Sequence, residues 1–143
     1  MAATDLYLAS FFGSCVKLGR QRIKRYSVAR WQPNLFFLET LPYLAPTPAV
    51  AYKGLDLVGY RKLYDTTMKM NGSYQKAVDL LLAEDTPKGI AFLCWCNPER
   101  QKEYPGLKCH TILIGYEMER RLPNLKVHYL DGRDRPVWER IQP

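Results

Sequence analysis

The chain has 143 residues, of which 47% are hydrophobic and 13% aromatic, and its formal net charge is +7. This length predicts a single domain, 1–143, with a packed core. No run of about 18 apolar residues occurs, which excludes a membrane-spanning helix. The first residues lack the basic and apolar regions of a signal peptide, so we expect a cytoplasmic protein whose four cysteines are reduced.

The positive charge is concentrated in one segment near the N-terminus. Such a cluster attracts phosphate groups through long-range electrostatic forces, which indicates a phosphate-bearing small molecule or a nucleic acid as partner. A solvated basic loop without a partner is the alternative interpretation. The six basic residues of this segment, among which no acidic residue occurs, are Lys17, Arg20, Arg22, Lys24, Arg25 and Arg30.

The N-terminal part of the chain predicts two strands and an irregular connection. Residues 5–12 are rich in aromatic and aliphatic side chains and are followed by Gly13. Residues 26–31 predict a second, shorter strand, which Pro33 ends. Residues 41–54 contain three prolines and a glycine, which favours an irregular connection over a helix.

Two helices follow this connection. Asp56 can cap the first helix, which Asn71-Gly72 ends, and Ser73 can cap the second, which ends before Thr86-Pro87. Apolar residues recur in both at helical spacing, so each helix has one apolar face. The two faces consist of Leu57, Tyr60, Leu63, Tyr64, Thr67 and Met68, and of Tyr74, Ala77, Val78 and Leu81.

A strand, a helix and a strand occupy the C-terminal half. Residues 89–96 are apolar on both alternating faces, as in a parallel strand that is covered on both sides. Residues 110–122 predict a helix, and residues 125–130 a last strand. We expect residues 131–143 to form a loose or docking tail. The whole pattern predicts a small three-layer α/β domain, Rossmann-like, with a mostly parallel sheet.

Thiols and an imidazole lie where such a fold binds ligands. Cys94 and Cys96 share one face near the carboxyl end of the central strand, and Cys109 and His110 begin the next helix. Ligands bind at that edge of an α/β sheet, and a helix N-terminus favours thiolates and phosphates. Cys109 is therefore the candidate nucleophile, and His110 the candidate acid–base or phosphate-binding group. The alternatives are a buried, inert cysteine and a histidine bonded to a carbonyl or to water.

The neighbouring strand ends supply candidate ligand-binding residues. Ser10 ends the first predicted strand and Arg30 the second, and parallel strands end at the same edge of a sheet. Ser10 can hydrogen-bond a ligand, and Arg30 can hold a carboxylate or phosphate with two hydrogen bonds. We add Arg25, Cys96 and Arg100 as candidates for the same pocket.

The same region carries the atoms that bind zinc. Cys94, Cys96, Cys109 and His110 could supply four ligands, but the Cys-x2–4-Cys spacing of structural zinc sites is absent. We therefore predict no metal site and no cofactor.

Five short motifs occur in a fixed order along nearly the full length of the chain. They are Ser10-Phe11-Phe12, Ser27-Val28-Ala29-Arg30, Leu44-Ala45-Pro46, Phe92-Leu93-Cys94 and Cys109-His110. This ordered set resembles the uncharacterised family called domain of unknown function 488. The family usually has arginine where this chain has Thr111, so Arg100 or Arg30 would have to supply that anion contact. Cys94-Trp95-Cys96 before Cys109-His110 is also similar to a related family, numbered 4326. Both resemblances imply a Rossmann-like α/β fold, and neither implies a settled activity.

Three classes of function fit these features. The first is an enzyme that acts on a nucleotide, a nucleobase or a nucleic acid with a Cys/His pocket at the carboxyl edge of the sheet. The second is a protein that sequesters a nucleotide or binds nucleic acid without catalysis, as the basic segment suggests. The third is a small interaction or inhibitor protein, because aromatic residues between Trp31 and Tyr52 can form a contact surface.

Overall fold

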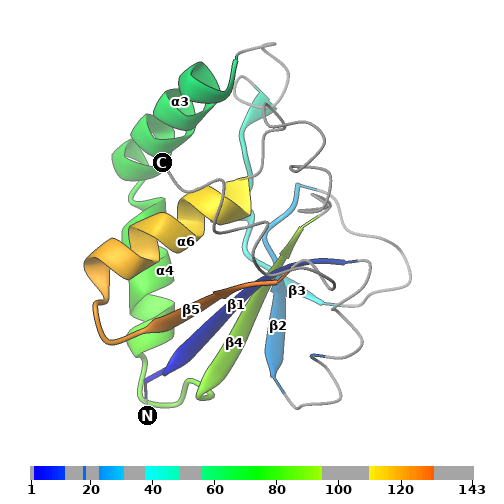
Figure 1. Cartoon of the computed structure of the whole chain (residues 1–143), viewed down its shortest axis with the longest axis vertical. Coiled ribbons are helices and arrows are strands. Elements are labelled where there is room, and N and C mark those ends of the chain that lie inside the picture. Colours follow the sequence, from blue (N-terminus) through cyan, green and yellow to red (C-terminus); the bar gives the residue numbers. More distant parts are fainter. Residues whose placement is uncertain are drawn as a thin grey trace.

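A five-stranded sheet, parallel at every pairing, forms the centre of the protein. The structure is a computed structural model that describes residues 2–11, 18, 23–30, 38–48, 56–94 and 110–130. The strands lie in the order β3-β2-β4-β1-β5 (Figure 1). Their bounds are Asp5–Ser10 for β1, Lys24–Ser27 for β2, Glu39–Thr40 for β3, Gly89–Cys94 for β4 and Lys126–Tyr129 for β5. The predicted α/β class and parallel sheet are therefore confirmed.

Strand β4 lies in the middle of the sheet and of the core. It pairs with β1 on one side, where Ser10 lies opposite Cys94, and with β2 on the other, where Ser27 lies opposite Leu93. All of its residues after Gly89 are buried. Because successive side chains point to opposite faces, this burial means that both faces of the sheet are covered, as the apolar pattern of residues 89–96 predicted.

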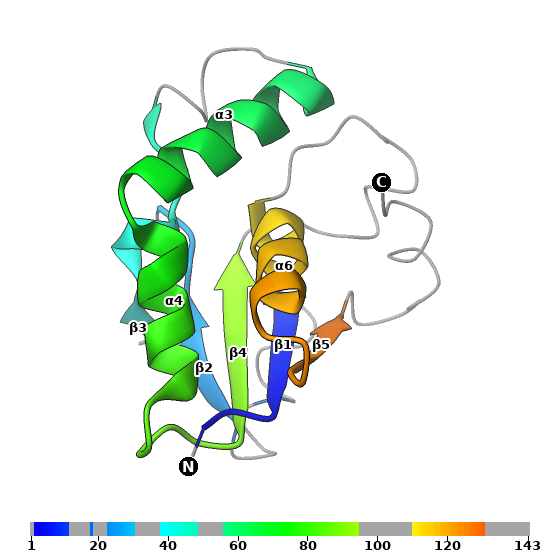
Figure 2. The ribbon, with the colours of Figure 1, turned by 90° about the vertical axis from the view of Figure 1, so that its left-hand side faces the viewer.

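Within the described residues, three α-helices and one 3-10 turn accompany the sheet. Their bounds are Pro42–Leu44 for the turn η1, Leu57–Met70 for α3, Ser73–Leu82 for α4 and His110–Arg121 for α6. Figure 2 shows α4 and α6 side by side over one face of the sheet, with α3 crossing above them. Helix α6 approaches the sheet closely at Gly115, where an added Cβ would lie 2.4 Å from Leu8 Cδ1 and 2.7 Å from the Tyr129 ring. No helix within the described ranges is long and apolar enough to cross a membrane.

The start of α3 is as predicted, whereas the start of α4 is not. The Asp56 carboxylate accepts a 2.7 Å hydrogen bond from the Gly59 amide and caps α3. The cap of α4 is Gly72, whose φ of +68° lies in the left-handed region that glycine adopts without strain. Ser73 is instead the first residue of α4 and is buried. The predicted serine cap is therefore wrong.

The second strand also differs from its prediction. It begins at Lys24 and ends at Ser27 rather than spanning 26–31, because Lys24 and Arg25 pair with Ile90 and Ala91 of β4. Arg30 therefore lies beyond the strand that it was predicted to end. The two-residue strand β3 was not predicted, since pairing with β2 defines it rather than a local pattern. Residues 95 and 96 of the predicted central strand, and the predicted tail 131–143, lie outside the described residues.

Candidate functional site

Several sequence-predicted residues meet at the carboxyl edge of the sheet. Strands β1, β2 and β4 run in parallel, so Ser10, Ser27 and Cys94 end at the same edge. Figure 2 shows the start of α6 beside the arrowhead of β4 at this edge. His110, the first residue of α6, therefore lies next to the strand ends, as the sequence predicted.

His110 is fixed between two segments that follow strands. Its ring is buried, and Nε2 lies 2.8 Å from the carbonyl oxygen of Val28, just after β2. A carbonyl only accepts, so Nε2 carries the proton of this hydrogen bond. The ring centroid also lies 5.8 Å from that of Tyr64, whose hydroxyl donates a 2.6 Å hydrogen bond to the Leu44 carbonyl of η1. His110 thus positions the segment after β2 directly and the segment after β3 through Tyr64.

Cys94, Ser10 and Thr111 form a buried cluster beside His110. The Cys94 thiol lies 3.6 Å from the Thr111 hydroxyl. Ser10 is opposite Cys94 in the sheet, and all three side chains are buried. Cys94 is therefore a core residue, and Thr111, at the position where the resembling family usually has arginine, contacts the interior of the protein.

Arg30 lies at a hollow of about 510 Å³ at the carboxyl edge. We call this the rim hollow. It is lined by the segment that follows β2 and by the end of β3 with the proline-containing segment after it: Ala29, Arg30, Thr40, Pro42, Ala45, Pro46, Thr47 and Pro48. Among the described residues of this lining, Arg30 alone carries a charge. The rim hollow begins one residue after Val28, whose carbonyl His110 binds.

The other sequence-predicted residues lie away from the rim hollow or outside the described residues. Arg25 lies within β2, before the carboxyl edge, and does not line the rim hollow. Lys24 of the basic segment forms a 3.0 Å ion pair with Glu39 of β3, so its charge is partly neutralised. Cys96, Arg100 and Cys109 lie outside the described residues.

The zinc hypothesis depends on residues that the structure does not describe. Within the described ranges, no group of three or more His, Cys, Asp or Glu side chains could hold a metal ion. Cys94 and His110 lie in those ranges, whereas Cys96 and Cys109 do not.

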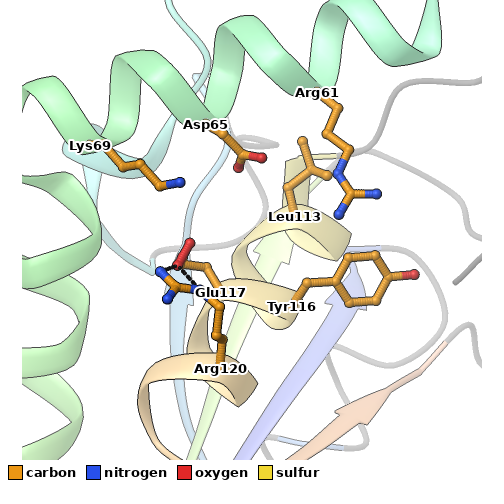
Figure 3. Close-up of a pocket in the computed structure, with 7 residues that line it drawn as sticks. All are labelled: Arg61, Asp65, Lys69, Leu113, Tyr116, Glu117 and Arg120. Atoms are coloured by element: carbon orange, nitrogen blue, oxygen red, sulfur yellow. Dashed lines mark hydrogen bonds and ion pairs between the residues drawn. The ribbon is translucent and has the colours of Figure 1, made fainter. Parts of the chain in front are cut away.

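A second hollow, of about 200 Å³, lies between α3 and α6 (Figure 3). We call it the interhelix cleft. Side chains spaced four residues apart on α3 face side chains of α6 across it, so each helix contributes one face. The lining residues are Arg61, Asp65 and Lys69 of α3 and Leu113, Tyr116, Glu117 and Arg120 of α6. Five of these seven carry charge.

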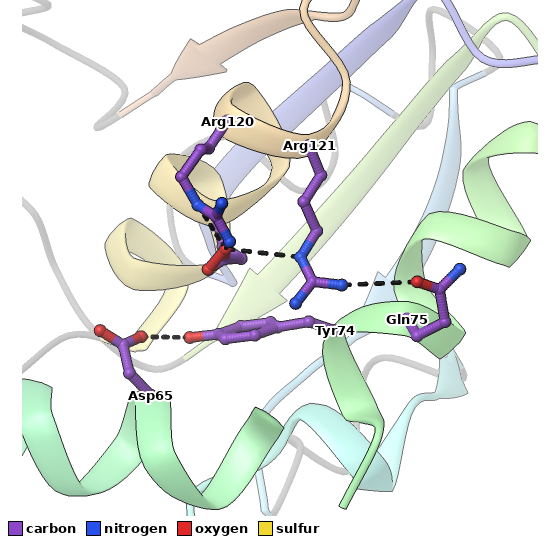
Figure 4. A network of polar contacts seen from close by, with 6 residues as sticks. Asp65, Tyr74, Gln75, Arg120 and Arg121 are labelled. Atoms are coloured by element: carbon purple, nitrogen blue, oxygen red, sulfur yellow. Dashed lines mark hydrogen bonds and ion pairs between the residues drawn. The ribbon is translucent and has the colours of Figure 1, made fainter. Parts of the chain in front are cut away.

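The two acids of the interhelix cleft have hydrogen-bond donors. Glu117 is buried and accepts hydrogen bonds from Arg120 Nε at 2.8 Å and from Arg121 Nε at 3.4 Å. Asp65 accepts a hydrogen bond from the Tyr74 hydroxyl. Figure 4 shows Arg121 above the Tyr74 ring, with its second contact directed at Gln75. This network joins the helices α3, α4 and α6.

Burial changes the acidity of the tyrosines near the interhelix cleft. The pKa of Tyr116 is raised to about 12, chiefly because burial disfavours the phenolate, although the nearby Arg61 opposes the shift. The pKa of Tyr74 is raised further, first by burial and then by its hydrogen bond to Asp65. Both phenols are therefore protonated at neutral pH, and Tyr74 acts as the donor to Asp65.

Sequence reasoning did not find the interhelix cleft. A signal was present, because charges recur at every fourth position from Arg61 to Lys69, and Glu117 lies within an otherwise apolar stretch of α6. Each pattern alone is typical of a solvated helix face. The charged residues of α3 and Glu117 of α6 line one cleft only because the two helices pack against each other.

Comparisons with protein-family models, with curated proteins and with solved structures found no match to this chain. The resemblance to the families 488 and 4326 therefore stays a prediction from the motifs.

Proposed function

We propose that the protein is an enzyme that binds a nucleotide or another phosphate-bearing small molecule in the rim hollow. One observation carries this proposal: a hollow of about 510 Å³ lies at the carboxyl edge of a parallel sheet with Arg30 in its wall. Ligand sites of α/β sheets lie at that edge, and ligand pockets commonly have volumes of about 300–1,000 Å³. The described residues of the walls are apolar apart from Arg30, Thr40 and Thr47, which suits a ligand with one anionic group and a less polar body.

Each residue has a role that its chemistry supports. Arg30 would hold the phosphate, since a guanidinium matches two phosphate oxygens at once. His110 would act as a positioning residue, because its Nε2 proton is used to hold the Val28 carbonyl beside the rim hollow. Cys109 directly precedes α6, and the positive end of a helix favours the thiolate form of such a cysteine. We therefore assign Cys109 as the nucleophile of the proposed reaction.

Binding of adenosine monophosphate and of inorganic phosphate, measured by isothermal titration calorimetry on the full chain, tests the binding proposal. Arg30→Gln should weaken binding of the nucleotide about tenfold or more, since a charged hydrogen bond is lost. The matched control is Lys88→Gln, which removes one positive charge from an exposed residue before β4, at the opposite edge of the sheet. Equal affinities in the two variants, or no nucleotide binding by the wild type, would reject the rim hollow as the site.

A second experiment separates catalysis from binding. Cys109→Ser should retain nucleotide affinity and abolish turnover of any substrate identified by mass spectrometry of the purified protein. Turnover that survives this substitution contradicts the assigned nucleophile. Tight binding by the wild type without turnover would instead support sequestration. Binding of a nucleic acid that weakens steeply with salt would support the nucleic-acid alternative.

A further inference from the structure

In the interhelix cleft, both acids accept hydrogen bonds, whereas two of the cations have no acid partner among the described residues. Glu117 accepts hydrogen bonds from two arginines, and Asp65 accepts one from Tyr74. Among the described residues, no hydrogen bond or ion pair joins Arg61 or Lys69 to an acid. Arg61 contacts the Tyr116 ring, with its guanidinium carbon 5.5 Å from the ring centroid.

The spacing of these residues along α3 favours ion pairs that do not form. Asp65 lies four residues after Arg61 and four before Lys69, which is the spacing at which opposite charges on a helix usually pair. Neither pair forms, and the Tyr74 hydroxyl binds Asp65 instead. Figure 3 shows the side chains of Arg61 and Lys69 extending from α3 toward α6, on either side of Asp65. Two cations therefore border the same cleft, and no acid of the described ranges is bound to either.

We propose that the interhelix cleft binds a small organic oxyanion, a phosphate or a carboxylate, between Arg61 and Lys69. The oxyanion accepts hydrogen bonds from the guanidinium and the ammonium, and its apolar part lies against Leu113 and Tyr116. The volume of about 200 Å³ restricts the ligand to a compact molecule. A metal cation is disfavoured, because the carboxylates of the cleft are already engaged and three basic side chains line it.

The test uses the full chain, labelled with ¹⁵N, and records amide chemical shifts during titration. Inorganic phosphate is the probe in one arm and succinate in the other, with chloride at the same ionic strength as the blank. We expect saturable shifts for residues 61–69 and 113–120 in at least one arm. The arm that saturates at the lower concentration identifies phosphate or carboxylate as the preferred group. Shifts no larger than those with chloride in both arms would overturn the proposal.

Variants locate the site and separate it from the rim hollow. Lys69→Gln and Arg61→Gln should each weaken binding of the saturating probe about tenfold or more. Lys62→Gln is the matched control, because it removes the same charge from an exposed position on α3 that does not line the cleft. Arg30→Gln should leave the shifts of residues 61–69 and 113–120 unchanged, because Arg30 does not line the cleft. Equal weakening by Lys62→Gln and Lys69→Gln, or loss of the shifts of residues 61–69 and 113–120 in Arg30→Gln, would contradict the assignment.

Discussion

The rim hollow and the interhelix cleft are built by opposite means, although helix α6 lines the second and reaches the Val28 carbonyl beside the first. The rim hollow is formed by segments that follow β2 and β3, and in the part of the chain that the structure describes its lining includes one charged side chain, Arg30. The interhelix cleft is formed by side chains of two packed helices, most of them charged. The first depends on where strands end, and the second on which helices meet. Chain order alone can therefore locate the first kind of site, whereas the second kind is visible only in the tertiary structure.

Helix α6 joins the two regions, so its seating on the sheet should affect both. Gly115 lets α6 approach β1, and an alanine Cβ there would overlap Leu8 and Tyr129. We expect Gly115→Ala to lower the free energy of unfolding by about 1–3 kcal/mol, as overpacked core positions do. It should also weaken ligand binding in both regions. Urea denaturation followed by circular dichroism measures the first effect, and the titrations described above measure the second.

A second glycine provides the control for this largest effect. Gly72 has nothing within 4 Å of an added Cβ, but its φ is +68°. Gly72→Ala should therefore cost about 1–2 kcal/mol through backbone strain alone, with binding intact in both regions. If Gly115→Ala were as stable as the wild type, α6 would have to lie farther from β1 than the structure places it.

Much of the fold could be predicted because the decisive signals are local. Apolar residues at helical spacing predicted α3 and α6 closely, and Asp56 was correctly predicted as a cap. The start of β2 was missed, because the charged residues Lys24 and Arg25 are locally typical of a loop. Only their pairing with β4 makes them part of the strand. A polar residue enters a strand when a neighbouring strand supplies its backbone partners, and that neighbour is distant in the sequence.

The candidate site was likewise predicted where chain order decides, and missed where distant residues come into contact. The position of His110 beside the strand ends follows from the parallel order of the elements and was predicted. Its hydrogen bond to the Val28 carbonyl joins residues 82 positions apart, so no local pattern could indicate it. The interhelix cleft was missed for the same reason, since Arg61 and Tyr116 become neighbours only when α3 packs against α6.

Substitution of His110 should disturb the rim hollow and leave the interhelix cleft intact. His110→Ala removes the donor to the buried Val28 carbonyl, which should cost about 1–3 kcal/mol of unfolding free energy. His110→Gln retains an amide N–H donor and should recover part of that loss. We expect nucleotide affinity in the rim hollow to follow the same order, wild type, then Gln, then Ala. Denaturation and calorimetry measure the two effects.

The two variants of His110 also give an outcome that would contradict its positioning role. If His110→Gln were no more stable than His110→Ala, the ring would act through packing rather than through the hydrogen bond to Val28. Anion binding in the interhelix cleft should be unchanged in both variants, because His110 does not line it. A parallel loss there would mean that the two regions are not independent.

The smallest effect is expected at Asp5, which lines neither region. The pKa of Asp5 is lowered, first by a hydrogen bond from the Thr4 hydroxyl at 2.6 Å and then by the His128 ring, whose Nε2 lies 2.8 Å away. A lowered folded pKa means that this stabilisation is fully present above the ordinary value of 3.8 and is lost as the pH falls through the folded pKa. Because the side chain is partly exposed, we expect Asp5→Asn to cost at most about 1 kcal/mol at neutral pH.

Unfolding free energies measured from pH 7 down to about pH 2 test whether the stabilisation by Asp5 is lost as the pH falls. Asp5→Asn should lie below the wild type at neutral pH and converge with it as the pH falls below the ordinary carboxyl range. Asp79→Asn, an exposed position of α4, changes the charge by the same amount without contacting His128. A constant difference between Asp5→Asn and the wild type across this range would show that the charge on Asp5 contributes nothing. Ligand affinity in the rim hollow and in the interhelix cleft should be unaffected, since Asp5 borders neither.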